Sequence, residues 1–259
     1  MQLAYRPFSD AGGSADAPTF REIADLTDLE IAAFDLGRRT LAPLPTRGRY
    51  SQETWRLAVR DTAVTLTTAG RARLGSDGSA QATGTTSDVL AARRSWLTVL
   101  LAERKLGNDA EFLVLYLRAD ARALGEHVTS DGRHRFVATT AETALVEMAH
   151  FVMPCDGGAE GTGSDLDTVE RVVSVQEWER LAPSTLGDST AVSVVVALRN
   201  HLDSGDDESV DDRRLSTFVG QEATVVAIGR DGDLAVRQTT RPGLLDDLRS
   251  ITHLGDGRA

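Results

Sequence analysis

The sequence has one cysteine, Cys155, among 259 residues. A single thiol excludes an intramolecular disulfide framework and a cysteine-rich zinc site. Long hydrophobic runs are also missing, because the longest fall far short of a membrane span. The first residues, 1–19, lack the basic-then-apolar pattern of a secretory signal. We therefore expect a cytoplasmic protein.

Positive charge is in deficit. The chain has 28 Lys and Arg against 39 Asp and Glu, which gives a net charge of −11. This excess of negative charge repels phosphate backbones and anionic lipid surfaces, so we expect neither nucleic acid nor membrane as a partner. The hydrophobic share of 41% and the charged share of 26% are ordinary for a globular protein that buries a full core.

Motifs for catalysis and cofactor binding are missing as well. There is no P-loop, no dinucleotide fingerprint and no nucleophile elbow. The acidic cluster around Asp206 lacks the residue order of a calcium loop, and the histidines lack zinc-site spacing. We expect each histidine at the surface or at a helix end; they are His127, His134, His150, His201 and His253. We therefore expect no cofactor, no metal and no enzyme activity, which favours a binding protein.

What the sequence does contain is one stretch that occurs twice. Asp131-Gly132 to Thr140 reappears as Asp231-Gly232 to Thr240, an offset of 231 − 131 = 100. Each Asp-Gly follows an apolar segment, as is typical of a β-hairpin tip. Each Thr-Thr precedes apolar residues spaced i, i+1, i+4, i+7, which predicts one helical face. These residues are Ala144, Leu145, Met148 and Phe151 in the first copy and Leu244, Leu245, Leu248 and Ile251 in the second.

A further strand-like run precedes each hairpin, at Phe112 to Leu117 and at Leu215 to Val219. The repeated unit is therefore three antiparallel strands followed by a helix. Two copies are too few for a solenoid, but they can pair about a pseudo-dyad. Such pairing hides the apolar faces of both units, at roughly 1.5–3 kcal/mol per large side chain. The predicted fold class is α+β, with a duplicated domain.

The remaining segments divide the chain around these two units. Residues 1–19 are predicted to be a disordered tail, 20–154 the first half, 155–168 a Gly-rich linker and 169–259 the second half. The two halves open alike, with a short strand and a capping residue.

Helices are predicted where a capping residue precedes an apolar face. Ser174 and Glu177 form a capping box at the start of the second half. Residues 74–85 have no hydrophobic rhythm and are predicted to be an exposed loop. The predicted helices run from Asp25 to Gly37, from Ser51 to Ala69, from Ser87 to Leu106 and from Ser189 to Leu202, although the β-branched residues of the last also allow a strand.

The order strand, helix, Leu44-Pro45, long helix, loop, helix and three-stranded meander resembles the EspG family of chaperones of actinobacterial type VII (ESX) secretion. The stretches that carry this resemblance are 26–30, 114–118, 135–145 and 234–245, and it covers about residues 20 to 254. It implies a quasi-two-fold duplication with a central, mostly antiparallel sheet flanked by two helical groups. It also implies a cytosolic chaperone that keeps secreted substrates of the PE and PPE type soluble until export.

The partner surface is predicted from the repeat, because hairpin tips are what a duplicated meander exposes. The expected partner is a secreted helical substrate of the PE/PPE or WXG type. A homodimer and a self-associating scaffold are left open, as is a small-molecule-binding sensor or enzyme on a duplicated α+β domain, which a deep polar pocket between the halves would favour. The predicted partner-binding residues are Asp131, Gly132, Arg133, Arg230 and Asp231.

Overall fold

The computed structural model describes residues 21–35, 41–76, 79–106, 109–153, 171–174, 176–177, 191–199, 211–219, 224–230 and 233–252. The first half contains β1 (Arg21–Thr27), α1 (Asp28–Phe34), the 3-10 helix η1 (Pro45–Arg49), α2 (Gln52–Thr68), β2 (Ala72–Leu74), β3 (Ala80–Ala82), α3 (Gly84–Ala92), β4 (Thr98–Leu106), β5 (Asp109–Leu117), β6 (Arg122–Val128), β7 (Arg133–Thr140) and α4 (Ala141–Val152). The second half contains β8 (Arg171–Ser174), β9 (Ala191–Arg199), β10 (Asp211–Val219), β11 (Thr224–Arg230), β12 (Asp233–Thr239) and α6 (Arg241–Thr252).

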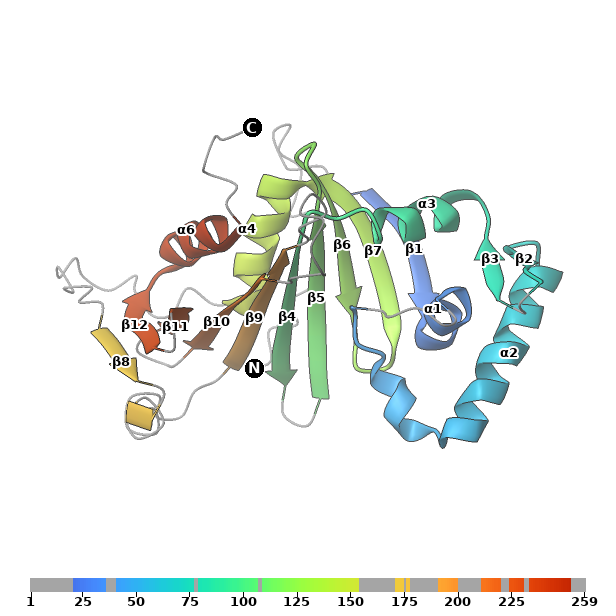
Figure 1. Cartoon of the computed structure of the whole chain (residues 1–259), viewed down its shortest axis with the longest axis horizontal. Helices are drawn as coiled ribbons and strands as arrows, with labels where there is room; N and C mark the ends of the chain where they lie inside the picture. Colours follow the sequence, from blue (N-terminus) through green and yellow to red (C-terminus); the bar gives the residue numbers. More distant parts are fainter. Residues whose placement is uncertain are drawn as a thin grey trace.

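Both halves contribute to one ten-stranded sheet (Figure 1). The strand order is β1-β7-β6-β5-β4-β9-β10-β11-β12-β8, and all neighbouring strands are antiparallel. The halves meet at the β4–β9 pair, which runs from Thr98↔Arg199 to Arg104↔Ser193. Read outward from this pair, each side is a meander that ends at the first strand of its own half. Such an order is what a duplication predicts, although descent of the halves from one ancestral unit stays a prediction.

The sheet carries helices on both faces, because its central strands are apolar on both sides. Along β5, Leu113 and Leu115 pack with α4 and α6, whereas Val114 and Tyr116 pack with α1, α2 and α3. All four side chains are 0–1% exposed. The α+β class, the antiparallel sheet and its two helical groups are thus confirmed. In the described part of the chain, no helix is both long and apolar enough to cross a membrane.

The two repeated helices begin and end as the 100-residue offset predicts, since 241 − 141 = 100 and 252 − 152 = 100. Thr140 caps α4 by accepting from the Thr143 amide at 3.2 Å, and Thr240 accepts from the Gly243 amide at 3.4 Å. The predicted apolar positions are fully buried except Ile251, at 7% exposure, and Leu245, which is partly buried. The two helices share one core cluster with the sheet.

Two predicted helices contain strands instead. The segment from Ser87 is helical only to Ala92 and continues as β4, whereas residues 191–199 form β9. β4 pairs with β5 and β9, and β9 pairs with β4 and β10. Because both strands lie at the centre of the sheet, hydrogen bonds on two sides outweigh local helix propensity. Each half therefore has a four-stranded meander rather than the predicted three-stranded one.

Other boundaries also differ from the prediction. The first helix is capped by Thr27 rather than Asp25, in a capping box with Glu30, because β1 extends to that residue to pair with β7. The predicted loop 74–85 contains the last residue of β2, the strand β3 that pairs with it and the start of α3. The helix from Ser51 is confirmed, and Ser174 accepts from the Glu177 amide as predicted. The predicted tail, the linker 155–168, the helix end at Gly37 and the acidic cluster at Asp206 lie outside the described residues.

Candidate functional site

The first predicted partner surface is the hairpin between β6 and β7. The strands pair up to Val128↔His134, and the Thr129 amide donates to the Arg133 carbonyl at 3.0 Å. The Gly132 amide donates back to the Thr129 carbonyl at 2.9 Å. Gly132 has a φ of +81°, which glycine adopts without strain. The hairpin is confirmed, with a three-residue loop in place of the two-residue Asp-Gly turn.

Gly132 faces the protein rather than a partner. A Cβ atom there would lie 2.6 Å from Thr46 Cγ2 and 2.8 Å from Asp28 Oδ2. The Gly132 carbonyl also accepts from the Asp28 amide at 2.9 Å. Its backbone therefore seats the loop against the start of α1 and against η1, and glycine is required because a side chain has no room.

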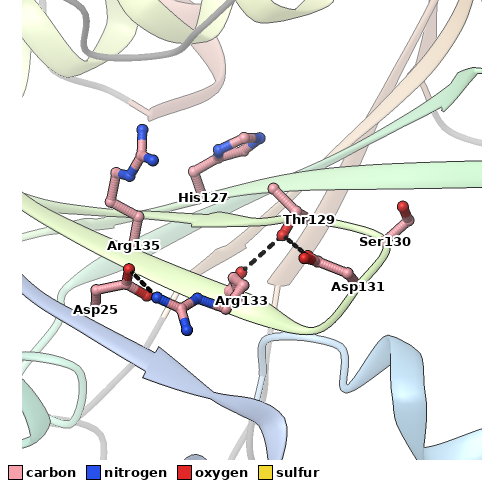
Figure 2. Close-up of a pocket in the computed structure, with 7 residues that line it drawn as sticks. All are labelled: Asp25, His127, Thr129, Ser130, Asp131, Arg133 and Arg135. Atoms are coloured by element: carbon pink, nitrogen blue, oxygen red, sulfur yellow. Dashed lines mark hydrogen bonds and ion pairs between the residues drawn. The ribbon is translucent and has the colours of Figure 1, made fainter.

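A hollow of about 520 Å³ lies beside this loop, and all of its lining residues belong to the first half (Figure 2). Arg133 pairs with Asp25 at 2.5 Å, and the Thr129 hydroxyl donates to Asp131. Arg133 and Arg135 remain 53% and 45% exposed, whereas His127 is 7% exposed. The lining residues are Asp25, His127, Thr129, Ser130, Asp131, Arg133 and Arg135.

The hollow offers charges of both signs and hydroxyl groups, which suit contacts with a polar polypeptide segment. Among the residues that line the hollow, no hydrogen bond joins a hydroxyl to a histidine, so a nucleophile with its base is not assembled here. Across the described residues, no three His, Cys, Asp or Glu side chains are grouped to hold a metal ion.

Directly behind the loop lies a cluster of buried charges that the sequence analysis missed. His134 is 0% exposed, with Nε2 at 2.7 Å from Asp28 Oδ1 and Nδ1 at 2.7 Å from Glu126 Oε1. The expectation that histidines lie at the surface is wrong for His134 and for His127. The available signal was the strand alternation of β7, which puts His134 on the same face as the buried Phe136. His150 lies in the last turn of α4, as expected, and His201 and His253 lie outside the described residues.

The cluster continues from Glu126 toward α3. Glu126 Oε2 accepts from the Tyr116 hydroxyl at 2.6 Å and from Arg93 Nε at 3.0 Å. Arg93 Nη1 then donates to Asp35 at 2.7 Å, and Asp35 also accepts from Arg94 at 2.9 Å. This chain of contacts ties α1, α3, β5, β6 and β7 together under one face of the sheet.

Burial and hydrogen bonding within the cluster shift the pKa values of His134, Asp28 and Glu126. Burial by itself would lower the pKa of His134, but its hydrogen bonds to Asp28 and Glu126 raise it above the ordinary value. Burial would raise the pKa of Asp28, yet hydrogen bonds from His134 and Thr46 leave it lowered. The pKa of Glu126 is also lowered, because the charge of Arg93 and the bond from His134 outweigh burial. The two carboxylates therefore favour the cationic form of His134.

Comparison with known proteins places this architecture. No family model and no curated protein sequence matches the chain. A solved structure does: EspG5, the type VII secretion system chaperone of Mycobacterium tuberculosis, in a complex with a PE25–PPE41 dimer. The match has a TM-score of 0.53 and 13% sequence identity, and it covers 90% of this chain and 96% of that chain.

The chain has the EspG fold. The resemblance predicted from the sequence is thereby confirmed at the level of the fold. The likeness is not confined to one half of the chain, because the match covers 90% of its residues.

Within this EspG fold the two predicted hairpin sites lie far apart. Five antiparallel pairings separate β6 from β11, so the two strands run in opposite directions and their hairpins lie at opposite rims of the sheet. β11 and β12 pair as far as Arg230↔Asp233. The side chain of Arg230 and the whole of Asp231 lie outside the described residues. The described ends of the two strand pairs, at Val128↔His134 and at Arg230↔Asp233, therefore lie at opposite rims of the sheet.

Proposed function

We propose that this chain is a chaperone that binds secreted substrates of a type VII secretion system and keeps them soluble for export, without enzymatic activity. The observation that carries the proposal is the EspG fold, shared over 90% of this chain and 96% of the EspG5 chain. That structure contains a PE25–PPE41 dimer, so we infer that the partner here is a secreted protein of the PE/PPE type. We place the protein in the cytoplasm, where such a substrate awaits export.

We further propose that the β6–β7 loop is a contact surface for this partner. Asp131 and Arg133 stand at an exposed loop beside a polar hollow, while Gly132 and the cluster behind it hold the loop in place. Preorganised polar groups favour binding because less conformational entropy is lost when the partner docks. Docking of a helical substrate here would also cover apolar surface of the substrate, which otherwise promotes its aggregation.

The proposal is tested by capture followed by reconstitution. The tagged full chain is expressed in its own host, captured partners are identified by mass spectrometry, and the binding of each purified partner is measured. We expect a helical secretion substrate whose solubility depends on the chain. Recovery of no such substrate, or of one that stays equally soluble alone, would contradict the proposal.

A pair of variants tests the loop. Arg133→Ser removes an exposed cation at the hollow, and we expect about tenfold weaker substrate binding, equivalent to about 1.4 kcal/mol. Arg122→Ser is the matched control: Arg122 is 72% exposed and ion-paired to Asp120, but it begins β6 at the end opposite the loop. Equal binding by the two variants would remove the loop from the partner surface.

A further inference from the structure

Asp28 is the point at which the β6–β7 loop, η1 and the buried cluster meet. Its Oδ1 contacts His134 Nε2 at 2.7 Å, and its Oδ2 accepts from the Thr46 amide and hydroxyl at 2.6 and 2.5 Å. Its own amide donates to the Gly132 carbonyl at 2.9 Å. Asp28, Thr46 and His134 are called the Asp28 junction below. A second tie joins the same two segments, because Arg49 donates to the Ser130 carbonyl at 3.0 Å.

The junction depends on the charge of His134. An imidazolium donates from both nitrogens, whereas a neutral imidazole donates from only one. His134 faces Asp28 from α1 and Glu126 from β6, and the ring of Phe136 stacks beside it at 6.5 Å. One bond further away, β5 and α3 contribute the Tyr116 hydroxyl and the Arg93 guanidinium to Glu126. Loss of the proton therefore leaves a nitrogen lone pair against one of two carboxylates.

When His134 loses its proton, the hydrogen bond that breaks is the one between His134 and Asp28. Glu126 is 0% exposed and stays fixed by Tyr116 and Arg93 whatever the state of His134. Asp28, by contrast, is otherwise held by Thr46, a half-buried residue of η1 near the surface. When neutral His134 keeps its single donor for Glu126, its Nε2 lone pair repels Asp28 Oδ1. Asp28 then loses the fixed position from which it orders η1 and the loop.

We propose that protonated His134 acts through the Asp28 junction as a pH-sensitive lock on the β6–β7 loop, and that its deprotonation loosens the loop and η1 together. The lock itself is independent of any partner. Its consequence for the partner rests on the proposed function: a loosened loop is less preorganised, so substrate binding weakens as pH rises.

Hydrogen–deuterium exchange on the full chain without any partner tests the lock. Protection factors, which remove the intrinsic pH dependence of exchange, are measured for segments 126–134 and 44–50 between pH 5 and pH 9. We expect protection in both segments to fall as pH rises, by up to about tenfold per pH unit while His134 loses its proton. Protection in α4 reports unfolding of the whole chain, and protection in the loop should stay below it at every pH, which separates local loosening from global unfolding. Loop protection that does not change with pH would overturn the proposal.

Three variants separate the lock from a merely structural role. His134→Gln keeps a hydrogen-bonding side chain without the charge, so its loop should be weakly protected at every pH. Thr46→Val removes the hydrogen bond from the Thr46 hydroxyl to Asp28, which lies outside the core. It should reduce loop protection and leave its pH dependence in place. This variant tests the lock if His134→Gln does not fold. His150→Gln, in the last turn of α4, is the control and should behave as the unmodified chain. A His134→Gln variant that retains the pH-dependent loss of protection would overturn the lock.

Because no partner takes part in these measurements, their failure leaves the proposed chaperone function untouched. Conversely, if no secretion substrate is captured, the exchange experiment still decides whether the lock exists. With a captured substrate, the expected result is binding that weakens with pH in the unmodified chain and the His150→Gln control but not in His134→Gln. Equal pH dependence in all three would overturn the link between the lock and binding.

Discussion

At the scale of single residues, the most consequential feature is the balance of buried charge. Three carboxylates, those of Asp28, Asp35 and Glu126, are at most 9% exposed. They meet three cationic groups, which are Arg93, Arg94 and His134. Removing one partner of such a buried set leaves an uncompensated charge and costs more than the pair contributes.

Substitutions of Arg93 and Arg94, which both pair with Asp35, test this balance. Arg93→Met should lower the free energy of unfolding by about 3–5 kcal/mol, because the buried carboxylates of Glu126 and Asp35 lose the guanidinium that they share. Arg94→Met is the matched control, since Arg94 binds the same Asp35 but its side chain is 43% exposed. We expect less than about 1 kcal/mol for the control. Both are measured by urea denaturation, and similar losses would mean that burial does not govern the energetics.

The stability of the protein should depend on pH with a maximum in the mildly acidic range. The pKa values of Asp28 and Glu126 are lowered in the fold, so their contribution is present above the unfolded values and is lost as pH falls. The pKa of His134 is raised above its ordinary 6.5, so its contribution is complete below that value and is lost as pH rises through the folded pKa. Urea denaturation from pH 3 to pH 9 checks this. In His134→Gln the decline on the alkaline side should be reduced; an unchanged decline would assign it to another group.

The residue scale is also where sequence reasoning predicted least. The exposed Arg133 and the glycine of the hairpin are recognisable from Asp-Gly chemistry. The role of His134 was not, because its partners stand 106 positions earlier and 8 positions earlier in the chain, at Asp28 and Glu126. Only the pairing of β6 with β7 and the start of α1 beside the loop bring them together.

At the scale of elements, sequence reasoning predicted the helices that local sequence determines and failed for the strands that depend on pairing with distant segments. The helices at 52–68 and 141–152 were predictable because a capping hydroxyl and one apolar face define each of them. β4 and β9 were mistaken for helices because their neighbours in the sheet come from opposite halves of the chain. The β-branched residues of 191–199 allowed a strand, but nothing within either segment identifies its neighbour in the sheet.

The contribution of α4 packing to the stability of the protein can be measured through one buried side chain. Leu145 is 0% exposed in the core shared by α4, α6 and the sheet. Leu145→Ala should therefore destabilise the protein by about 2–5 kcal/mol. Leu57→Ala is the control on another helix, since Leu57 of α2 is 55% exposed and should change stability by no more than about 0.5 kcal/mol. Thermal and urea denaturation should rank the two variants identically; a small loss for Leu145→Ala would contradict the described packing.

The hairpin loop offers a second test at this scale. Gly132→Ala combines a positive φ with a Cβ that meets Thr46 and Asp28, so we expect a loss of about 2–4 kcal/mol. Gly70→Ala isolates the backbone term, because Gly70 has a φ of +71° but open space around its Cα. About 1 kcal/mol is expected there. Equal losses in the two variants would show that the loop does not press against Asp28.

At the scale of the whole molecule, the β4–β9 pair joins the halves through seven residue pairs within a continuous sheet. A fragment of residues 20–154 would expose β4 as a free edge, and free edges pair with other strands. We expect this fragment to self-associate in proportion to its concentration, as measured by light scattering after size exclusion, whereas the full chain has that edge covered. A soluble, monomeric fragment would show that the first half does not need its sheet neighbour.

Because β6 and β11 run in opposite directions, their ends at Val128 and Arg230 lie on opposite sides of the sheet, and this limits which of them a single bound element can contact. The two strands are also separated by five interstrand distances, which amount to about 24 Å. A single helix is only about 10–12 Å across with its side chains. A helix that crosses only the end of β6 at Val128 therefore does not reach the end of β11 at Arg230, and a substrate that contacted both strand ends would need an element at least as long as their separation.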